Sequence, residues 1–218
     1  MTQSYFVVGT DTNVGKTYVA SRLVQHFARL GLTVIGMKPI ASGCEPSEQG
    51  ELQNEDVIAL SNASNVTAPK NLINPYHFVP AIAPHIAAEQ AAIVISLDTI
   101  AHAYQQLTTL AEVVVVEGAG GFFVPLNQTQ TLADLAVGLN VPIILVVGIR
   151  LGCINHALLT VEAIKTRGLT LAGWVANEID PNSRTFAENL TSLQQRIAAP
   201  CLSVVRWQGE ANFNLTSA

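Results

Sequence analysis

The sequence predicts an α/β fold in which a mostly parallel sheet is flanked by helices. Short β-branched and apolar runs alternate with longer segments of helical period, the order expected for parallel strands joined by crossover helices. Of the 218 residues, 49% are hydrophobic and only 12% are charged, a balance that suits a largely buried sheet. The length fits one domain, residues 1–218, with an extensive core better than it fits two domains.

Periodicity assigns the elements along the chain. Six short apolar runs are predicted to be strands, at residues 5–8, 33–37, 113–116, 143–147, 171–176 and 202–205. Helical period predicts helices at residues 16–30, 97–110, 132–139, 156–167 and 184–197. The first helix places Val19, Leu23 and Phe27 on one face and ends at Gly31, a favoured residue just past a helix terminus. Residues 42–54 and 74–84 are predicted to be loops, and long loops in compact domains are commonly functional.

Charge, cysteines and hydropathy exclude several classes of protein. The net charge is −5 and the 11 Lys and Arg residues are scattered, so no basic stripe supports nucleic-acid binding. Cys44, Cys153 and Cys201 have neither metal-ligand spacing nor a disulfide framework, which indicates thiols in a reducing cytoplasm. The first residues, MTQSYFVVGT, lack the pattern of an export signal, and the longest apolar run, residues 141–149, is too short to cross a bilayer. A cytoplasmic protein without membrane partners is expected.

The strongest functional signal is the glycine-rich segment GTDTNVGKT at residues 9–17, between the first predicted strand and the first predicted helix. Backbone N–H groups at such a helix start face phosphate oxygens, Lys16 adds positive charge near the β- and γ-phosphates, and Thr17 offers a hydroxyl to Mg²⁺. Five residues separate Gly9 from Gly15, one more than in the common phosphate-loop pattern. We expect the longer loop to touch something besides phosphate. The alternative is a tight turn with a chance Gly-Lys-Thr.

Lys38 begins the segment KPIASG, residues 38–43, directly after the second predicted strand. This position puts it at the carboxyl edge of the sheet beside the phosphate loop, where ligands of open α/β sheets bind. A lysine there can neutralise the negative charge that develops in acyl-phosphate formation. An ordinary surface lysine is the alternative, and the adjoining Ser42 and Gly43 favour the functional role.

Two acidic residues are candidates for a magnesium site. Glu117 ends the predicted strand at residues 113–116 and precedes the segment GAGG, whose glycines allow a ligand to approach the backbone closely. Mg²⁺ typically takes one or two carboxylates plus phosphate oxygens and water, so a carboxylate at this edge fits. Asp56, at the end of the segment NED, is the second candidate. An acidic residue that stabilises a helix start is the alternative for Asp56.

Four segments together resemble those of the dethiobiotin synthetases: GTDTNVGKT, KPIASG, VEGAGG and LGCINHA, which begin at residues 9, 38, 116 and 151. They occur in the order of that family, and the resemblance runs from near residue 4 to about residue 207. It implies a P-loop NTPase-like fold and an ATP-dependent ligase of biotin biosynthesis. Such an enzyme joins 7,8-diaminononanoate (7,8-diaminopelargonate) and CO₂ to give dethiobiotin, ADP and phosphate.

The reaction implied by this resemblance proceeds through a mixed anhydride. One amine captures CO₂ as a carbamate, the carbamate oxygen attacks the γ-phosphate, and the second amine displaces phosphate to close a cyclic urea. By the same resemblance the catalytic residues are Lys16, Lys38 and Thr12, and Mg²⁺ is held by Thr17, Asp56 and Glu117. The positive charges spread the charge of phosphoryl transfer. Thr12, Lys38 and Ser42 would hold the carbamate or diamine end of the substrate.

The resemblance also implies the remaining binding sites. The nucleotide would contact the phosphate loop, the segment after the third strand and the ends of the last two strands: Asn13, Val14, Gly15, Lys16, Thr17, Tyr18, Asp56, Glu117, Gly118, Ala119, Gly120, Asn177, Glu178, Arg206, Trp207 and Gln208. Family members are homodimers, and Gly152, Cys153 and Asn155 would receive the carboxylate tail of a substrate bound mainly by the partner. Asn155 is compatible with a second role as N-cap of the helix expected to begin at His156.

The sequence departs from the family near the adenine site. A proline is usual where Arg206 stands, and the tail after Gln208 is shorter than usual and matches poorly, which puts the adenine contacts there in doubt. Asn13 replaces an acidic residue found in some members.

Two rival classes share the phosphate loop. Partition or septum-site ATPase switches act through protein partners or membrane and usually carry an additional lysine early in the loop, where this chain has Asp11 and Thr12. Amide-forming ligases of cobyrinate type need an added glutaminase domain, for which 218 residues leave no room.

Overall fold

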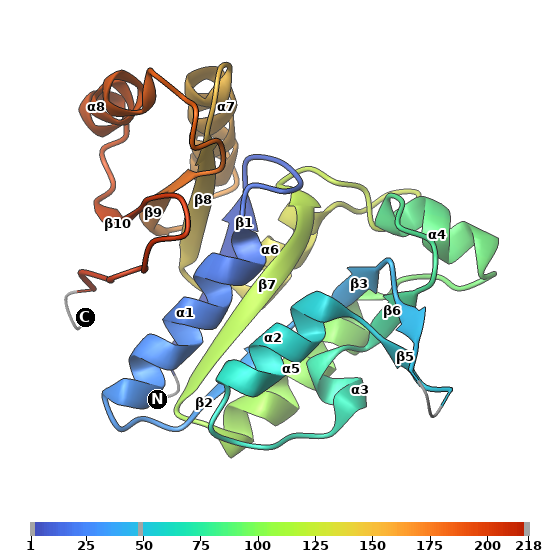
Figure 1. Ribbon diagram of the computed structural model, residues 1–218. Coiled ribbons are helices and arrows are strands. Elements are labelled where there is room, and N and C mark those ends of the chain that lie inside the picture. Colours follow the sequence, from blue (N-terminus) through green and yellow to red (C-terminus); the bar gives the residue numbers. More distant parts are fainter. Residues whose placement is uncertain (1–2, 48–49, 216–218) are drawn as a thin grey trace.

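The computed structural model describes residues 3–47 and 50–215, which form a six-stranded sheet with helices on both faces (Figure 1). The strand order is β10-β9-β8-β1-β7-β2, and every neighbouring pair runs parallel. The strands are β1 (Gln3–Gly9), β2 (Val34–Met37), β7 (Val113–Gly121), β8 (Ile143–Ile149), β9 (Leu171–Glu178) and β10 (Cys201–Val205). The predicted α/β fold with a mostly parallel sheet is confirmed, and all six predicted strands are present.

Two strands run further than their apolar residues suggested. β7 continues through its glycines to Gly121, so Glu117 lies within the strand and does not end it. β9 continues to Glu178, so Asn177 is a strand residue and does not follow the strand. Backbone hydrogen bonds to β1 and β8 extend these ladders, and such bonds need no apolar side chain. Both polar residues are therefore held on rigid sheet backbone.

All helices predicted from periodicity are present: α1 (Lys16–Arg29), α5 (Leu97–Leu110), α6 (Leu132–Leu139), α7 (Cys153–Thr166) and α8 (Phe186–Arg196). α7 begins three residues earlier than predicted, because Gly152 adopts a φ of 91° as its N-cap. Asn155 therefore lies in the first turn, and the prediction that it caps the helix is wrong. Three further helices were not predicted: α2 (Glu55–Ala63), α3 (Lys70–Ile73) and α4 (Pro84–Gln90).

The two segments predicted to be loops contain short strands. β3 (Ile40–Ser42) pairs in parallel with β6 (Tyr76–Phe78), and β4 (Glu45–Pro46) pairs antiparallel with β5 (Leu52–Gln53). The loop prediction is wrong for Ser42 and for residues 45–46, 52–53 and 76–78, because strands of two or three residues are too short to show a period.

Side chains that alternate along the strands build one apolar layer on each face of the sheet. Phe6 and Val114 point to the face covered by α5, α6, α7 and α8. Tyr5 and Val113 point to the face covered by α1, α2 and the C-terminal segment, which lies in front in Figure 1. Within residues 3–47 and 50–215, no helix combines the length and apolar composition needed to cross a membrane.

Candidate active site

The glycine-rich segment connects β1 to α1, as its sequence context predicts. Gly15 is the N-cap of α1 with a φ of 88°, and a Cβ there would lie 2.1 Å from Nδ2 of Asn177, so no other residue fits. Asn13 has a φ of 58°, a conformation that asparagine tolerates better than most residues. The Lys16 ammonium donates a hydrogen bond to the Asp11 carbonyl at 2.8 Å. These constraints hold the free N–H groups of the α1 start at the carboxyl edge of the sheet.

Lys38, Asp56, Glu117 and Thr17 converge beside this helix start. Strand register explains the first contact, because Met37 of β2 pairs with Val116 of β7 and thereby sets Lys38 next to Glu117. The Lys38 Nζ lies 2.6 Å from Oε1 of Glu117 and 2.8 Å from Oδ2 of Asp56. The Thr17 Oγ1 lies 2.7 Å from Oδ1 of Asp56 and 2.8 Å from Oε1 of Glu117.

Asp56 reaches this cluster because α2 begins next to β3. The side chain of Asn54 caps α2 by accepting hydrogen bonds from Asp56 N at 3.0 Å and Val57 N at 3.4 Å. The same side chain donates to the Ser42 carbonyl at 3.1 Å. Asn54 therefore holds Asp56, a candidate Mg²⁺ ligand, close to Ser42, a candidate substrate-binding residue. Sequence reasoning did not single it out, although an Asn followed by two acidic residues is a helix-start signal.

Burial and charge act against each other in this cluster. Burial raises the pKa of Glu117, and the Lys38 ammonium offsets only part of that effect. Burial alone would lower the pKa of Lys38, but Glu117 and Asp56 outweigh it and hold that pKa above its ordinary value. Burial opposes ionisation of Asp56 as well, yet Lys38 and the Thr17 hydroxyl hold the Asp56 pKa below its usual range. Lys38 is thus a charged counter-ion at neutral pH.

Lys16 behaves differently from Lys38. Burial and the nearby Lys38 ammonium lower the pKa of Lys16 to about 8. Its charge is therefore only partly compensated by the protein, and phosphate oxygens are a suitable counter-ion.

A cavity of about 760 Å³ unites most of the predicted catalytic and phosphate residues. Predicted residues on its wall are Thr12, Asn13, Gly15, Lys16, Thr17, Lys38, Ser42, Asp56, Glu117, Ala119 and Gly120. Val14 and Gly118 are buried instead of lining it. Sequence reasoning missed an apolar wall made of Ile40, Ala81, Ile82, Ala83, Pro84 and Val124. The prolines of the segment 74–84 were the available signal for part of this wall.

Two polar atoms at this cavity are buried without a hydrogen-bond partner: Oγ of Ser42 and Oε2 of Glu117. A buried polar atom without a partner costs free energy, and such atoms occur where a ligand completes them. The cavity therefore offers a hydroxyl and a carboxylate oxygen to a bound molecule.

A second cavity of about 510 Å³ lies on the other side of the loop and shares Asn13 and Gly15 with the first. Its predicted wall residues are Tyr18, Asn177, Glu178, Arg206, Trp207 and Gln208, and the structure adds Ile179, Val205 and Gly209. The Asn177 amide nitrogen donates to the Val14 carbonyl at 2.9 Å, which ties this cavity to the phosphate loop.

Gly152, Cys153 and Asn155 line neither of these two cavities. Gly152 and Asn155 are exposed at the start of α7, whereas the Cys153 side chain is buried. The preceding Arg150 pairs with Asp11 of the phosphate loop at 2.5 Å, so this segment is attached to the loop without lining either cavity.

Comparisons with known proteins agree with this arrangement. A family model described as AAA domain matches residues 3–213. The ATP-dependent dethiobiotin synthetase BioD of Nitrosospira multiformis is 50% identical over 94% of this chain and 88% of its own length. Proteins of that name from Chromohalobacter salexigens and Cellvibrio japonicus are each 48% identical, over 93% and 99% of this chain and 89% and 94% of theirs.

Solved structures bear on the fold alone, because their sequence identity is low. The septum site-determining protein MinD of Pyrococcus horikoshii has a TM-score of 0.59 at 15% identity, over 94% of this chain and 82% of its own. A ParA family ATPase from Chlorobium tepidum has a TM-score of 0.58 at 13% identity, over 95% and 86%. These likenesses confirm the predicted P-loop NTPase-like fold, and the sequence identities of the curated relatives show that the chain belongs to the ATP-dependent dethiobiotin synthetase family.

Proposed function

We propose that this chain is a single-domain ATP-dependent dethiobiotin synthetase, a ligase that joins 7,8-diaminononanoate and CO₂ and converts ATP to ADP and phosphate. The curated relatives that share this name, up to 50% identical, support the proposal. The observation that carries it is the Lys38 ammonium between the carboxylates of Asp56 and Glu117, in one cavity with Lys16 and Ser42.

The chemistry requires positive charge around a phosphoryl group in transfer. The carbamate oxygen of the substrate forms a bond to the γ-phosphorus while the bond to ADP breaks, and the second amine then expels phosphate from the mixed anhydride. Lys16 lies at the loop and Lys38 lies across the same cavity, so their ammonium groups can flank the transferred oxygens. Such preorganised charges stabilise the transition state more than the ground state.

Thr17, Asp56 and Glu117 have the chemistry of a Mg²⁺ site. The Thr17 hydroxyl lies 2.7 Å from Oδ1 of Asp56 and 2.8 Å from Oε1 of Glu117, and Oε2 of Glu117 is buried without a partner. Hard oxygen ligands of this kind suit Mg²⁺, which usually takes one or two carboxylates. When bound, Mg²⁺ supplies neutralisation of the β- and γ-phosphate oxygens.

The first cavity also fits the substrate. The hydroxyls of Thr12 and Ser42 can donate hydrogen bonds to the carbamate oxygens and accept hydrogen bonds from the amine groups, and the Ser42 hydroxyl has no other partner among the described residues. The wall formed by Ile40, Ile82 and Val124 suits the hydrocarbon chain of diaminononanoate, because apolar contacts with it need no polar partner. We assign the adenine to the second cavity, between Asn177 and the segment 206–208.

A homodimer would give the exposed start of α7 a role. We propose that Gly152, Cys153 and Asn155 bind the carboxylate tail of the substrate held in the partner, through the N–H groups of this 14-residue helix. Leu151, which is 99% exposed, and Leu159, which is 63% exposed, provide apolar surface for such a contact. The free thiols Cys44, Cys153 and Cys201 are compatible with a cytoplasmic enzyme.

One assay tests the function directly. The protein is incubated with diaminononanoate, bicarbonate, Mg²⁺ and ATP, and dethiobiotin is sought by mass spectrometry. A folded protein that binds ATP and forms no dethiobiotin refutes the proposal. Hydrolysis of ATP that is independent of the diamine would instead favour a switch ATPase of the partition or septum-site type.

A further inference from the structure

The chain beyond β10 returns across the face of the sheet that carries α1. In Figure 1 this segment, drawn in red, runs back from β10 on the side of the molecule where α1 lies. Ala211 and Phe213 are 9% and 8% exposed and belong to the apolar layer that α1 forms with the sheet. The Phe213 ring contacts His26 of α1 edge to face at 5.8 Å, and Asn214 N donates to the Leu202 carbonyl at 3.0 Å. The far end of the segment is therefore anchored in the core.

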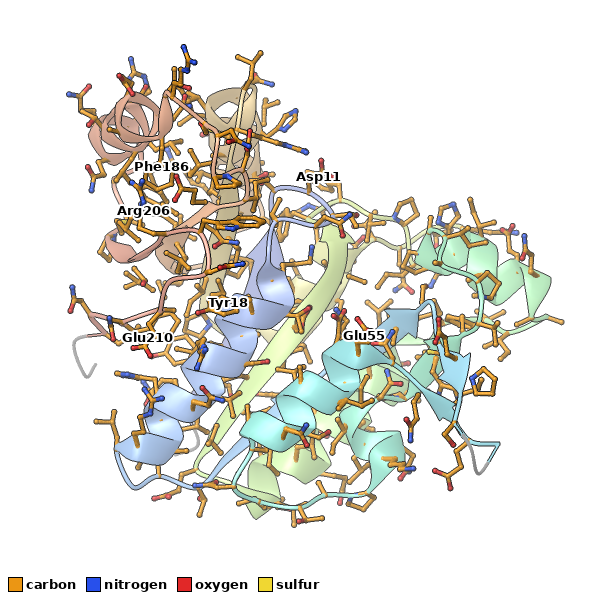
Figure 2. The ribbon with its side chains drawn as sticks, viewed as in Figure 1. Asp11, Tyr18, Glu55, Phe186, Arg206 and Glu210 are labelled. Carbon is orange, nitrogen blue, oxygen red and sulfur yellow. The ribbon has the colours of Figure 1, made fainter. Side chains whose placement is uncertain are left out.

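Glu178 holds the near end of the same segment. Its Oε2 accepts a hydrogen bond from the backbone N of Trp207 at 2.9 Å and forms an ion pair with Nε of Arg206, also at 2.9 Å. The Arg206 guanidinium also lies 4.4 Å from the centroid of the Phe186 ring, and Figure 2 shows these two side chains close together. Arg206 is thus held by a carboxylate and an aromatic ring.

Tyr18 holds the middle of the segment. Its hydroxyl donates to the Gly209 carbonyl at 2.5 Å, and Figure 2 shows Tyr18 on α1 facing the chain between Arg206 and Glu210. Gln208, one residue earlier, has a φ of 54°, which is strained for a residue other than glycine. Strain of this kind persists only where surrounding contacts enforce it, so the flanking contacts at Glu178 and Tyr18 must fix this backbone.

Between these attachments, residues 206–209 form one wall of the second cavity, opposite Gly15 and Asn177. Phe213 does not line that cavity. We propose that residues 206–213 form a strap over the base of the nucleotide, and that Phe213 is a positioning residue which sets the affinity for the base from outside the site. This inference rests on the proposed use of a nucleoside triphosphate.

The mechanism is a change in the population of the closed strap. If the Phe213 anchor is removed, the strap spends more time away from the cavity, and the apparent dissociation constant rises by the inverse of the closed fraction. The phosphate loop is held by its own contacts at Lys16 and Asn177, so affinity for the phosphate part is unaffected. The strap therefore acts on the base alone.

The test compares ATP with inorganic triphosphate, which lacks a base. Calorimetry on Phe213→Ala is expected to show roughly a five- to twentyfold higher Kd for ATP and a Kd for inorganic triphosphate within about twofold of wild type. Phe213→Leu keeps an apolar anchor and is expected to restore most ATP affinity. Tyr18→Phe removes only the hydroxyl and is expected to weaken ATP about fivefold, again without an effect on triphosphate.

The control is Tyr5→Leu, which removes an aromatic ring stacked on Phe27 at 5.6 Å in the same apolar layer but outside the strap. It is expected to lower Tm while ATP affinity stays within about twofold. The inference is overturned if ATP and triphosphate lose affinity equally, if Phe213→Ala binds ATP normally, or if Tyr5→Leu reproduces its effect. These measurements do not depend on turnover. A protein that makes no dethiobiotin would refute the proposed function, whereas the role of the strap is decided by the binding measurements alone.

Discussion

Lys38 has two tasks at the scale of single residues. It neutralises Asp56 and Glu117, and it faces the cavity in which the phosphoryl group is proposed to react. Glu117 is 1% exposed and Lys38 is 4% exposed, so neither charge is stable there without the other or a cation. Any substitution of Lys38 must therefore be judged on stability and turnover separately.

We predict that Lys38→Ala lowers turnover about 100-fold or more, because a preorganised charge at the transferred phosphoryl group is lost. The Kd for ATP is expected to stay within about threefold, since the phosphate loop is intact. In EDTA the variant should lose about 3–5 kcal/mol of unfolding free energy through the unpaired Glu117, and Mg²⁺ should restore part of this loss. Steady-state kinetics, calorimetry and urea titrations measure the three effects.

Lys70→Ala is the matched control, because the Lys70 side chain is 79% exposed and pairs with Glu51 at the surface. Its effect on turnover and stability should be close to zero. Unchanged turnover in Lys38→Ala would remove Lys38 from the mechanism.

The lowered pKa of Lys16 predicts a pH dependence of nucleotide binding. In the protein without nucleotide the pKa of Lys16 is about 8. Phosphate bound next to Lys16 stabilises the charged form and raises that pKa. A lysine is charged below its pKa, so affinity is full below about pH 8 and falls by up to about tenfold per pH unit above it. Calorimetry at about pH 7.5 and 9.5 in two buffers should detect uptake of about one proton at the higher pH. Lys16→Gln should bind weakly and without this pH dependence, and equal affinity at both pH values in wild type would contradict the assignment.

At the scale of elements, the start of α6 is joined to the end of α7 through one carboxylate. Asp134 accepts hydrogen bonds from the backbone N and the hydroxyl of Thr131, both at 2.7 Å, and from Arg167 at 2.6 Å. The hydrogen bonds from Thr131, followed by Arg167, lower the pKa of Asp134 to about 2. The carboxylate thus caps one helix and pairs with the C-cap of another.

We predict that Asp134→Asn reduces the free energy of unfolding by about 1 kcal/mol at neutral pH, a value already reduced for the partial exposure of the side chain. Because the folded pKa is depressed, the stabilisation is present above the unfolded pKa of about 3.9 and disappears as the pH falls towards 2. Urea titrations of both proteins between neutral pH and about pH 2.5 follow the difference. Asp98→Asn, an exposed first-turn residue of α5, should change stability by a few tenths of a kcal/mol. A difference that is as large at the lowest pH as at neutral pH would contradict this account.

The long elements could be predicted from sequence because burial gives them a pattern. Runs such as residues 143–147 are apolar throughout, since β8 is covered on both faces. α2 and α4 were missed because each is short and only two or three of its residues are buried, among them Leu60 and Ala87. β3 and β6 are shorter still, and their pairing depends on contacts between distant parts of the chain.

The candidate site also contains some residues that the sequence predicts and others that it does not. Lys38 and Glu117 could be found because each follows a run of apolar strand residues, and parallel strands bring such positions to one edge of a sheet. The prolines of the segment 74–84 indicated a loop, but they did not show that residues 81–84 line the cavity, because that position depends on how α4 packs against β3. Asn155 was wrongly predicted to precede α7, because the helix begins at a left-handed turn at Gly152. Glycine allows such a turn, but its presence in a sequence does not show that one occurs.

At the scale of the whole molecule, the phosphate loop separates two independent halves of the site. The first cavity is built by β3, β7, the starts of α1, α2 and α4, and Lys38 just after β2. The second is built by β9, β10 and the strap, and the two share Asn13 and Gly15. The segment at residues 152–155 belongs to neither half and is exposed at the start of α7. One chain therefore contains the proposed phosphate, base and amine sites, and the proposed carboxylate site lies on its exposed surface, where a second copy of the chain is proposed to use it.

We predict that Leu159→Glu prevents the proposed dimer from forming, because it places a charge on the exposed apolar surface of α7. The Kd for ATP should stay within about twofold, because both cavities lie within one chain. The KM for diaminononanoate should rise about tenfold or more, because its carboxylate loses the partner's helix start. Light scattering, calorimetry and steady-state kinetics measure these three quantities.

Leu30→Glu is the matched control, since Leu30 is also 63% exposed but lies at the end of α1, away from α7. It should leave the dimer and both constants unchanged. A monomeric Leu159→Glu variant with an unchanged KM for the diamine would separate dimerisation from substrate binding, and the carboxylate tail would then have to bind within one chain. A wild-type monomer with full activity would remove the shared site altogether, because the exposed N–H groups at the start of α7 would have no substrate within reach.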